Sequence, residues 1–296
     1  MSHSRPAALL PRAVLAVLTV LIVLTARSLW RSAHDLQVTH YELSAEQLTD
    51  CIRIVQLTDL HNSEFGEENA QLVDAVRQQQ PDVIFMTGDM LLDSEQDVSI
   101  AAGVVRQLTA VAPVYVSYGN HEKQYEERWQ SDLCAVFAEA GAAVLDDSYI
   151  DTEINGQAVR IGGGYGYGQP EATTAHSKNA AFRAESAYLK QVQATDRYKL
   201  LLWHMPVCWI QNGSLDAWDI DVVFSGHAHG GQIIFPGIGG LYAPDQGFFP
   251  GREWGLFHSD DGEHTLVLSR GLGNSMHIPR WNNIPEIVTV DIVPAG

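Results

Sequence analysis

The sequence predicts an α/β fold that follows an apolar N-terminal segment. Short apolar strands alternate with helical segments between residues 51 and 145, a pattern typical of βαβ units around a largely parallel sheet. Aspartate, asparagine or histidine follows directly after most of these strands. Close to the N-terminus lies a run of 14 residues without a charge. Together these features indicate one domain whose polar site lies at the ends of its strands.

The apolar run covers residues 13–26, and it extends to 22 residues at 9–30 if the long side chain of Arg12 reaches the membrane interface. A segment of that length can cross a bilayer, so the sequence favours a single-pass transmembrane anchor after a tail of residues 1–8. A signal peptide cleaved near Ala26-Arg27-Ser28 is the alternative. Two arginines flank the run on each side, and the N-terminal amino group tips the orientation slightly towards a catalytic domain outside a bacterial cell membrane.

Residues 31–49 are interpreted as a linker with a first strand at 36–43, and residues 50–296 as the catalytic domain. Its first half contains apolar runs that predict strands at 51–57, 82–86 and 113–118. Helical periodicity with Pro and Gly as terminators predicts helices at 67–79, 98–110 and 124–140. These six elements form the expected parallel βαβ series.

The second half begins with a predicted hairpin at residues 149–161, because Asn155-Gly156 is the strongest two-residue turn signal. The glycine-rich stretch at residues 162–168 has no G-x-G-x-x-G register, so we interpret it as a mobile loop in which Tyr165 and Tyr167 are candidate substrate contacts. The remaining expected elements are a helix at 180–192, strands at 198–203, 221–224, 264–269 and 286–292, and loops with short strands at 232–254.

The charge of the chain excludes some partners. Its formal net charge is −18, and the part after residue 31 carries −22, because four of the 18 basic residues lie within the first 31 positions. Such a body offers no basic surface for nucleic acid, so a phosphate group must be captured by a local positive centre such as bound metal. The three cysteines form no C-x-x-C pair and suggest no disulfide framework.

The residues after the strands form a set of oxygen and nitrogen donors that suits two divalent ions. The set consists of Asp59, His61, Asp89, Asn120, His204, His227 and His229. We expect one ion to bind Asp59, His61 and His229, and the other to bind Asn120, His204 and His227. Asp89 would bridge the two ions, because one carboxylate can hold ions about 3.5–4 Å apart.

The ordered motifs D-x-H, G-D, G-N-H, H and G-H-x-H resemble the calcineurin-like metallophosphoesterase superfamily, and the similarity extends from about Cys51 to Ile292. The resemblance implies a four-layer α/β/β/α sandwich with the metals at one edge. It also implies hydrolysis of a phosphoester by a hydroxide between the metals, with His121 as the acid that protonates the leaving oxygen. Manganese is the expected metal, with zinc, iron or magnesium as alternatives.

Further motifs look like those of bacterial transmembrane metallophosphoesterases, a subgroup that includes phosphodiesterases and UDP-2,3-diacylglucosamine hydrolases of lipid A biosynthesis. These motifs are Gly230-Gly231-Gln232, Leu241-Tyr242-Ala243-Pro244 and residues 269–275 with Pro279-Arg280. Protein phosphatases of the superfamily carry Asp-Arg-Gly after the G-D motif, which this chain lacks. Arg270 and Arg280 are candidate phosphate ligands, and pairing with Glu286 is the alternative for them.

Two other functions stay open at this stage. A relative that keeps the sandwich without turnover would be a metal-binding scaffold, and a nuclease of the same fold would need a basic groove that the composition does not offer. The intact set of donors favours a membrane-anchored phosphoesterase that acts on a phosphodiester or diphosphate, with a small or lipid-linked substrate.

Overall fold

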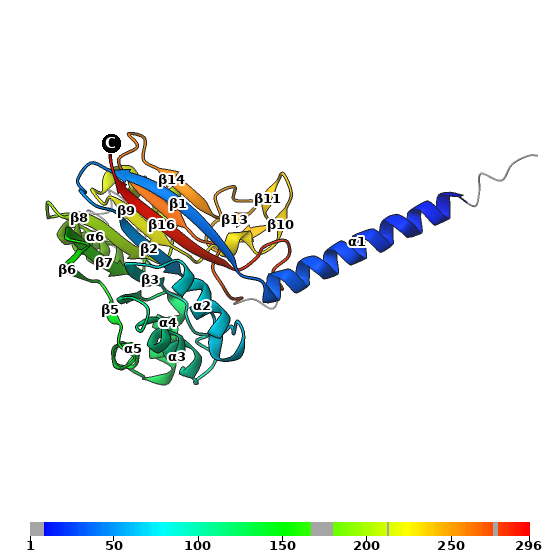
Figure 1. Ribbon diagram of the computed structural model, residues 1–296, viewed down its shortest axis with the longest axis horizontal. Helices are drawn as coiled ribbons and strands as arrows, with labels where there is room; N and C mark the ends of the chain where they lie inside the picture. The colour runs from blue at the N-terminus through cyan, green and yellow to red at the C-terminus, as the bar shows by residue number, and fades with distance from the viewer. Residues whose placement is uncertain (1–8, 167–179, 212, 275–277) are drawn as a thin grey trace, which may run out of the picture.

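The computed structural model describes residues 9–166, 180–211, 213–274 and 278–296, and it consists of two sheets that pack face to face between helices. The long helix α1 (Leu9–His34) projects from one end of this body (Figure 1). Both sheets have six strands. The layers α/β/β/α match the predicted fold class.

The first sheet has the strand order β1-β16-β2-β3-β4-β5. Strands β2 to β5 are parallel, as the βαβ pattern predicts, whereas β16 is antiparallel to β2 and parallel to β1. The strands are β1 (Gln37–Ala45), β2 (Ile52–Leu57), β3 (Val83–Thr87), β4 (Val114–Ser117), β5 (Ala143–Leu145) and β16 (Glu286–Pro294). The first and last strands of the described chain are therefore neighbours in one sheet.

The second sheet has the order β14-β15-β9-β8-β7-β6. Its strands are β6 (Ser148–Ile154), β7 (Gln157–Gly164), β8 (Tyr198–Trp203), β9 (Val222–Ser225), β14 (Gly255–His258) and β15 (Thr265–Leu268). The predicted hairpin is present, with Asn155 (φ 50°) and Gly156 (φ 75°) in its turn. Two short hairpins lie outside the sheets: β10 (Ile234–Phe235) with β11 (Gly239–Gly240), and β12 (Tyr242–Ala243) with β13 (Gly247–Phe248).

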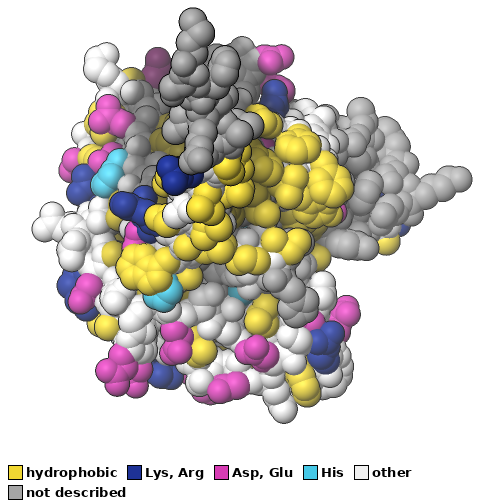
Figure 2. Space-filling model, turned by 90° about the vertical axis from the view of Figure 1, so that its right-hand side faces the viewer, with side chains coloured by type: hydrophobic (Ala, Val, Ile, Leu, Met, Phe, Trp, Pro, Cys, Tyr) yellow, Lys and Arg dark blue, Asp and Glu magenta, His cyan; other side chains and the backbone are white. Residues whose placement is uncertain are grey.

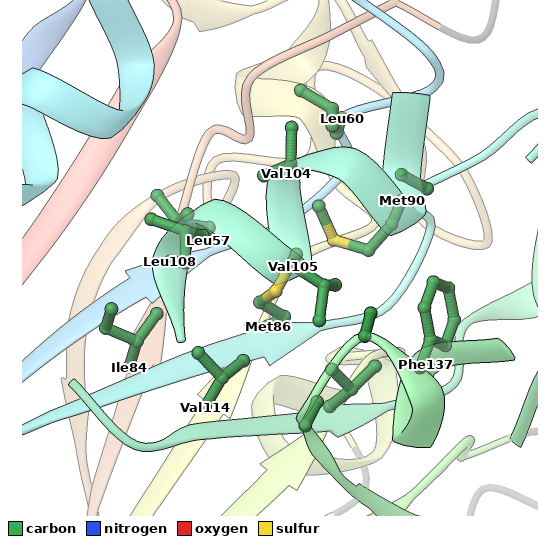
Figure 3. Packing of buried hydrophobic residues seen from close by; sticks show 14 of the residues in the cluster. Leu57, Leu60, Ile84, Met86, Met90, Val104, Val105, Leu108, Val114 and Phe137 are labelled. Carbon is green, nitrogen blue, oxygen red and sulfur yellow. The ribbon is translucent and has the colours of Figure 1, made fainter. Parts of the chain in front are cut away.

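Helices cover the outer face of each sheet. Those on the first sheet are α2 (Ala70–Gln78), α3 (Ser99–Leu108), α4 (Asn120–Trp129) and α5 (Leu133–Glu139). Those on the second are α6 (Ala180–Val192), α7 (Val207–Gln211) and α8 (Ser214–Ala217). In the first outer layer, Val105 and Leu108 of α3 lie over Ile84, Met86 and Val114 of the sheet (Figure 3).

The predicted single helix at residues 124–140 is wrong, because the structure has two helices there. Helix α4 ends at Gln130, which has a left-handed backbone (φ 52°), and α5 begins after Asp132. The Asp132 side chain accepts a hydrogen bond from the backbone N–H of Ala135 (2.9 Å) and so caps the second helix. The pair Ser131-Asp132 inside the helical pattern is the sequence signal that indicates this break.

The predicted mobile loop at residues 162–168 is also wrong in its first part, because Gly162, Gly163 and Gly164 belong to strand β7. A Cβ atom at Gly163 would lie 2.4 Å from Leu145 Cβ, and one at Gly164 would lie 2.8 Å from the Trp203 ring. These glycines therefore allow close packing within and beside the second sheet. Tyr167 and Gly168 lie outside the described residues.

Helix α1 contains a stretch, Pro11–His34, that is long and apolar enough to cross a membrane, with a mean hydropathy of 2.1. The apolar part of this stretch is not buried against the body, whereas Ser32 near its end is only 5% exposed. A signal sequence near an N-terminus has the same properties. At its C-terminal end the helix contacts the catalytic domain, because the backbone N–H groups of Asn282 and Asn283 donate hydrogen bonds to Ser28 Oγ (2.7 Å) and Ser32 Oγ (3.3 Å).

Candidate metal centre

The predicted donors follow strands β2, β3, β4, β8 and β9 at one edge of the sandwich, on loops except for Asn120, the first residue of α4, and His229, which begins a 3₁₀ turn. Parallel strands of both sheets point their carboxyl ends towards this edge, so residues far apart in the sequence meet there. Asp59, His61, Asp89 and His204 are 0–3% exposed. The structure therefore brings the donors together in a buried polar cluster.

Five of these donors have a left-handed backbone conformation. The φ angles are 54° at Asp59, 46° at His61, 56° at Asp89, 66° at His227 and 48° at His229. Such conformations cost roughly 1–3 kcal/mol each for residues other than glycine, and they persist where the surrounding structure enforces them. Here the loops are held by backbone hydrogen bonds from Asp59 N to Gly88 O (3.0 Å) and from His61 N to Asp89 O (3.1 Å). The fold thus holds strained loops in the positions that aim the side chains at one another.

The first half of the cluster contains Asp59, His61 and His229. The Nε2 atoms of the two histidines are 3.3 Å apart, and Asp59 Oδ1 lies 3.8 Å from His61 Nε2 and 3.5 Å from His229 Nε2. One ligand atom from each of the three residues lies within 4.8 Å of the others. This is the spacing of side chains around a single ion.

The second half contains Asp89, His204 and His227, whose ligand atoms also lie within 4.8 Å of one another. Asp89 Oδ2 is 3.1 Å from His204 Nε2 and 3.8 Å from His61 Nε2. Asp89 therefore lies between the two halves, as expected of a shared carboxylate.

Neighbouring groups orient the histidine rings of the second half. His204 Nδ1 lies 2.8 Å from the backbone carbonyl of Thr87, to which it can only donate, so Nε2 is the nitrogen left to bind a metal ion. His227 Nε2 lies 3.0 Å from Asp245 Oδ2, and an ionised carboxylate can only accept, so the lone pair of His227 is at Nδ1. Asp245 was not identified from the sequence, because it lies in the loop region 232–254.

Charge within the cluster shifts the pKa values of its members. Burial alone would raise the pKa of Asp89, but His204 beside it lowers that pKa well below the usual range. Burial would lower the pKa of His204, yet Asp89 raises it to about 9. Burial lowers the pKa of His229 to about 3. The carboxylates are thus ionised near neutral pH, as metal ligands must be.

The donor set fits two divalent ions. The side-chain oxygen of Asn120 and Nδ1 of His61 are buried and have no hydrogen-bond partner among the described residues. Buried polar atoms are nearly always paired, so an amide oxygen left open at the edge of this cluster suits a cation. Mixed carboxylate, amide and imidazole donors suit first-row divalent metals.

His121 lies on the first turn of α4, beside the cluster. Its ring centroid is 4.7 Å from that of His61, and its Nδ1 is 2.7 Å from Asp93 Oδ1. The Asp93 backbone N–H also approaches Nδ1 (3.3 Å), but the shorter contact to an acceptor decides that Nδ1 carries a proton. Asp93 is fixed in turn by Arg128 (2.9 Å). The other nitrogen, Nε2, is therefore the one that can exchange a proton with a ligand.

Glu122 organises the loops that carry two of the donors. Its carboxylate is fully buried and accepts hydrogen bonds from the backbone N–H groups of Asp89 (2.8 Å), Met90 (2.7 Å) and Gly119 (2.8 Å). Burial and repulsion from Asp89 raise the pKa of Glu122. These contacts brace the loops that follow β3 and β4.

We expect Glu122→Gln to lower the free energy of unfolding by about 1–3 kcal/mol, because the amide NH₂ would face a backbone N–H and leave it unpaired. Chemical unfolding of the detergent-solubilised protein measures this loss. Glu127→Gln, on the exposed side of the same helix, is the matched control and should leave the stability unchanged within about 0.5 kcal/mol. Equal stabilities of the two variants would contradict the bracing role.

The candidate substrate residues occupy different environments. Arg270 forms an ion pair with Glu286 (2.8 Å), which was the alternative considered from the sequence. Arg280 is 4% exposed, and its Nη2 lies 3.2 Å from His229 Nδ1. Burial lowers the pKa of Arg280 to about 10, and its Nη1 has no hydrogen-bond partner among the described residues. Tyr165 is half-buried after β7, and Tyr167 lies outside the described residues.

Comparison with known proteins identifies the family. The family model for calcineurin-like phosphoesterases matches residues 52–231, more than half of the chain. The chain is 28% identical over 241 residues to the uncharacterized metallophosphoesterase YkoQ of Bacillus subtilis, covering 80% of this chain and 82% of that protein. It is 26% identical over 251 residues to the phosphodiesterase YaeI of Escherichia coli, covering 81% and 82%.

A solved structure with a similar fold is a dimetal phosphatase from Danio rerio, with a TM-score of 0.40 and 12% identity over 74% of this chain and 87% of that one. The family match includes every predicted metal donor and His121. The chain belongs to the calcineurin-like phosphoesterase family and is a metal-dependent phosphoester hydrolase.

Proposed function

We propose that the protein is a membrane-anchored hydrolase that uses two divalent ions to cleave a phosphodiester or diphosphate bond. The observation that carries this proposal is the convergence of two donor groups on Asp89, with His121 beside them. Manganese is the proposed metal, on the chemistry of the donor set.

The proposed metal ligands are Asp59, His61 and His229 in one half, Asn120, His204 and His227 in the other, and Asp89 between them. Two ions held by these residues would activate a water molecule and neutralise charge on the phosphate oxygens. The backbone carbonyl of Thr87 and the carboxylate of Asp245 fix the rings of His204 and His227, which leaves one nitrogen of each ring for a metal ion. The protein thus supplies an arrangement that needs no large movement when the reaction begins.

His121 is the proposed general acid. Its Nε2 donates a proton to the leaving oxygen, and Asp93 holds the remaining proton on Nδ1. After Nε2 has lost its proton, the neutral ring keeps the proton on Nδ1, which is the tautomer that the contact with Asp93 stabilises. The side chain is 15% exposed, so a leaving group can reach it from solvent.

The N-terminal helix is the proposed anchor, with residues 9–30 in the membrane and residues 50–296 as the catalytic domain. The apolar length of α1 and its lack of burial support anchoring. The net charge of the body disfavours a nucleic-acid substrate. A lipid-linked diester or diphosphate such as UDP-2,3-diacylglucosamine is therefore a candidate substrate, with Arg280 as a candidate contact to a phosphate.

The proposal is tested by hydrolysis of bis-p-nitrophenyl phosphate, p-nitrophenyl phosphate and UDP-2,3-diacylglucosamine. The full-length protein in detergent is stripped of metal with a chelator and then resupplied with Mn²⁺, Zn²⁺ or Mg²⁺. We expect activity to fall at least about 10³-fold without metal and to return with Mn²⁺, because the metals activate the attacking water. The diester or diphosphate should be cleaved faster than the monoester.

Three results would contradict the proposal. Turnover that persists after complete removal of metal would exclude the metal-dependent mechanism. Absence of turnover with two ions bound per chain would instead favour the metal-binding scaffold. Cleavage of single-stranded DNA in preference to all three substrates would favour the nuclease.

A further inference from the structure

A small apolar pocket lies in the loops that follow the last two metal donors. Its volume is about 220 Å³, and no polar surface is exposed on its wall. It is lined by Gln232, Ile233, Leu241, Tyr242, Phe248 and Ile278. Most of these residues belong to or adjoin the short hairpins β10–β11 and β12–β13, which neither sheet includes.

The pocket adjoins the metal centre through Gln232. The donor His229 begins a short 3₁₀ turn, η3 (His229–Gly231), and Gln232 N donates a hydrogen bond back to His229 O (3.0 Å). The Gln232 side chain is 3% exposed, and its Nε2 donates to Asn274 Oδ1 and to Ile278 O. Gln232, at the inner end of the apolar pocket, therefore lies three residues after the proposed metal ligand His229.

One short segment, residues 278–283, connects the pocket, the metal centre and the N-terminal helix. Ile278 lines the pocket, and Arg280 lies 3.2 Å from Nδ1 of His229. Asn282 and Asn283 form the hydrogen bonds to Ser28 and Ser32 of α1 described above. The pocket and the metal centre are thus both tied to the base of the helix that would enter the membrane.

The surface around the pocket is apolar. Phe248 and Ile278, two of its lining residues, are 71% and 46% exposed, and the neighbouring Ile238 and Phe249 are 69% and 54% exposed. The hairpins β10–β11 and β12–β13 lie at the end of the body from which α1 projects (Figure 1). Figure 2 shows this end of the body with α1 pointing towards the viewer, so the hydrophobic side chains in the middle of the face include those of α1.

We propose that this pocket binds the hydrocarbon part of an amphiphilic phosphoester, an alkyl or acyl chain attached close to the phosphate that is cleaved. This inference rests on the proposed function, because the phosphate must lie at the metal centre. A hydrocarbon fits a wall without exposed polar groups, whereas a nucleobase would leave its own hydrogen-bonding groups unpaired there. The position of the pocket beside α1 would let such a chain enter from the lipid side.

The test is a series of alkyl p-nitrophenyl phosphate diesters, from methyl to octyl, assayed with the full-length protein in one detergent. Burial of each added methylene should raise kcat/KM about three- to fourfold until the pocket is filled. The double variant Phe248→Ser/Ile278→Ser should reduce this increment to below about twofold per methylene. The double variant Ile238→Ser/Phe249→Ser removes exposed apolar side chains that do not line the pocket, so it should keep the full increment.

The increment is the ratio of the kcat/KM values of two esters that differ by one methylene, both measured with the same variant. A general loss of activity therefore does not change it. Equal increments in the two double variants, or no increment in the unaltered protein, would overturn the pocket assignment. A thymidine 5′-p-nitrophenyl diester that is cleaved faster than every alkyl ester would also overturn it, because a nucleobase would then be the preferred occupant.

A binding measurement separates this inference from the proposed function. Failure to cleave even the methyl ester with two ions bound would refute the proposed hydrolysis. Calorimetry with methyl and octyl phosphonate does not depend on turnover, and the pocket should bind the octyl compound at least about 30-fold more tightly. Equal affinities would refute the pocket whatever the catalytic result.

Discussion

Substitution of Asp89 by asparagine is expected to lower kcat/KM at least about 10³-fold, the largest loss for any conservative change in the chain. Asp89 Oδ2 lies 3.1 Å from His204 Nε2 and 3.8 Å from His61 Nε2, so it belongs to both halves of the cluster. Asparagine keeps the shape but removes the negative charge that two cations would share. The loss should exceed the roughly 10- to 100-fold effect of residues that only support a ligand.

Metal content distinguishes this explanation from misfolding. The Asp89→Asn protein should bind about one divalent ion per chain where the unaltered protein binds about two, measured by atomic spectroscopy after dialysis. Asp74→Asn is the control, because Asp74 is exposed on α2 and its ion pair among the described residues is with the neighbouring Arg77. Retention of two ions with activity within about threefold of normal would show that Asp89 is not shared.

His121→Ala is expected to reduce kcat/KM about 10²- to 10⁴-fold for diesters with poor leaving groups, and much less for p-nitrophenyl esters. p-Nitrophenolate leaves readily without a proton, whereas an alkoxide needs the acid that His121 Nε2 provides. A plot of log(kcat/KM) against the pKa of the leaving group should therefore become steeper in the variant. His258→Ala changes an exposed histidine on β14 and should leave the slope as it is.

Metal content and the pH profile test the role of His121 further. Two ions per chain should remain in His121→Ala, and loss of an ion would instead make His121 a metal ligand.

Burial lowers the pKa of His121, and Asp93 opposes that shift. Because an acid acts in its protonated form, below its pKa, Asp93→Asn should move the alkaline limb of the kcat profile to lower pH. An unchanged alkaline limb would contradict the Asp93–His121 pairing.

The positions of the donors could be predicted from the sequence because the rule that places them is simple. Each donor follows an apolar strand, and the ends of parallel strands converge at one edge. Asp93 and Asp245 could not be found in this way. Each lies in a loop and contacts a histidine, and no sequence pattern connects the loop with that histidine. The left-handed conformations at the donors could not be located either, because aspartate and histidine adopt them more often than most residues but this preference does not show at which positions.

The errors in the fold have local causes. The sequence of α4 and α5 is helical on both sides of Asp132, so helical periodicity alone extends one helix across the break. The glycines at residues 162–164 suggested a loop, although their role is to allow contact with Leu145, Tyr188 and Trp203. Glycine in a strand depends on what packs against it, and that information comes from the other layers of the fold.

The connection between α1 and the first sheet sets how far the body of the protein can lie from the helix. Only Asp35 and Leu36 separate the helix from β1, and two extended residues span about 7 Å. Strand β1 is then fixed along its full length to β16. For a protein anchored by α1, so short a connection holds the body close to the bilayer surface, so turnover of a lipid substrate would follow its surface density in the bilayer instead of its bulk concentration.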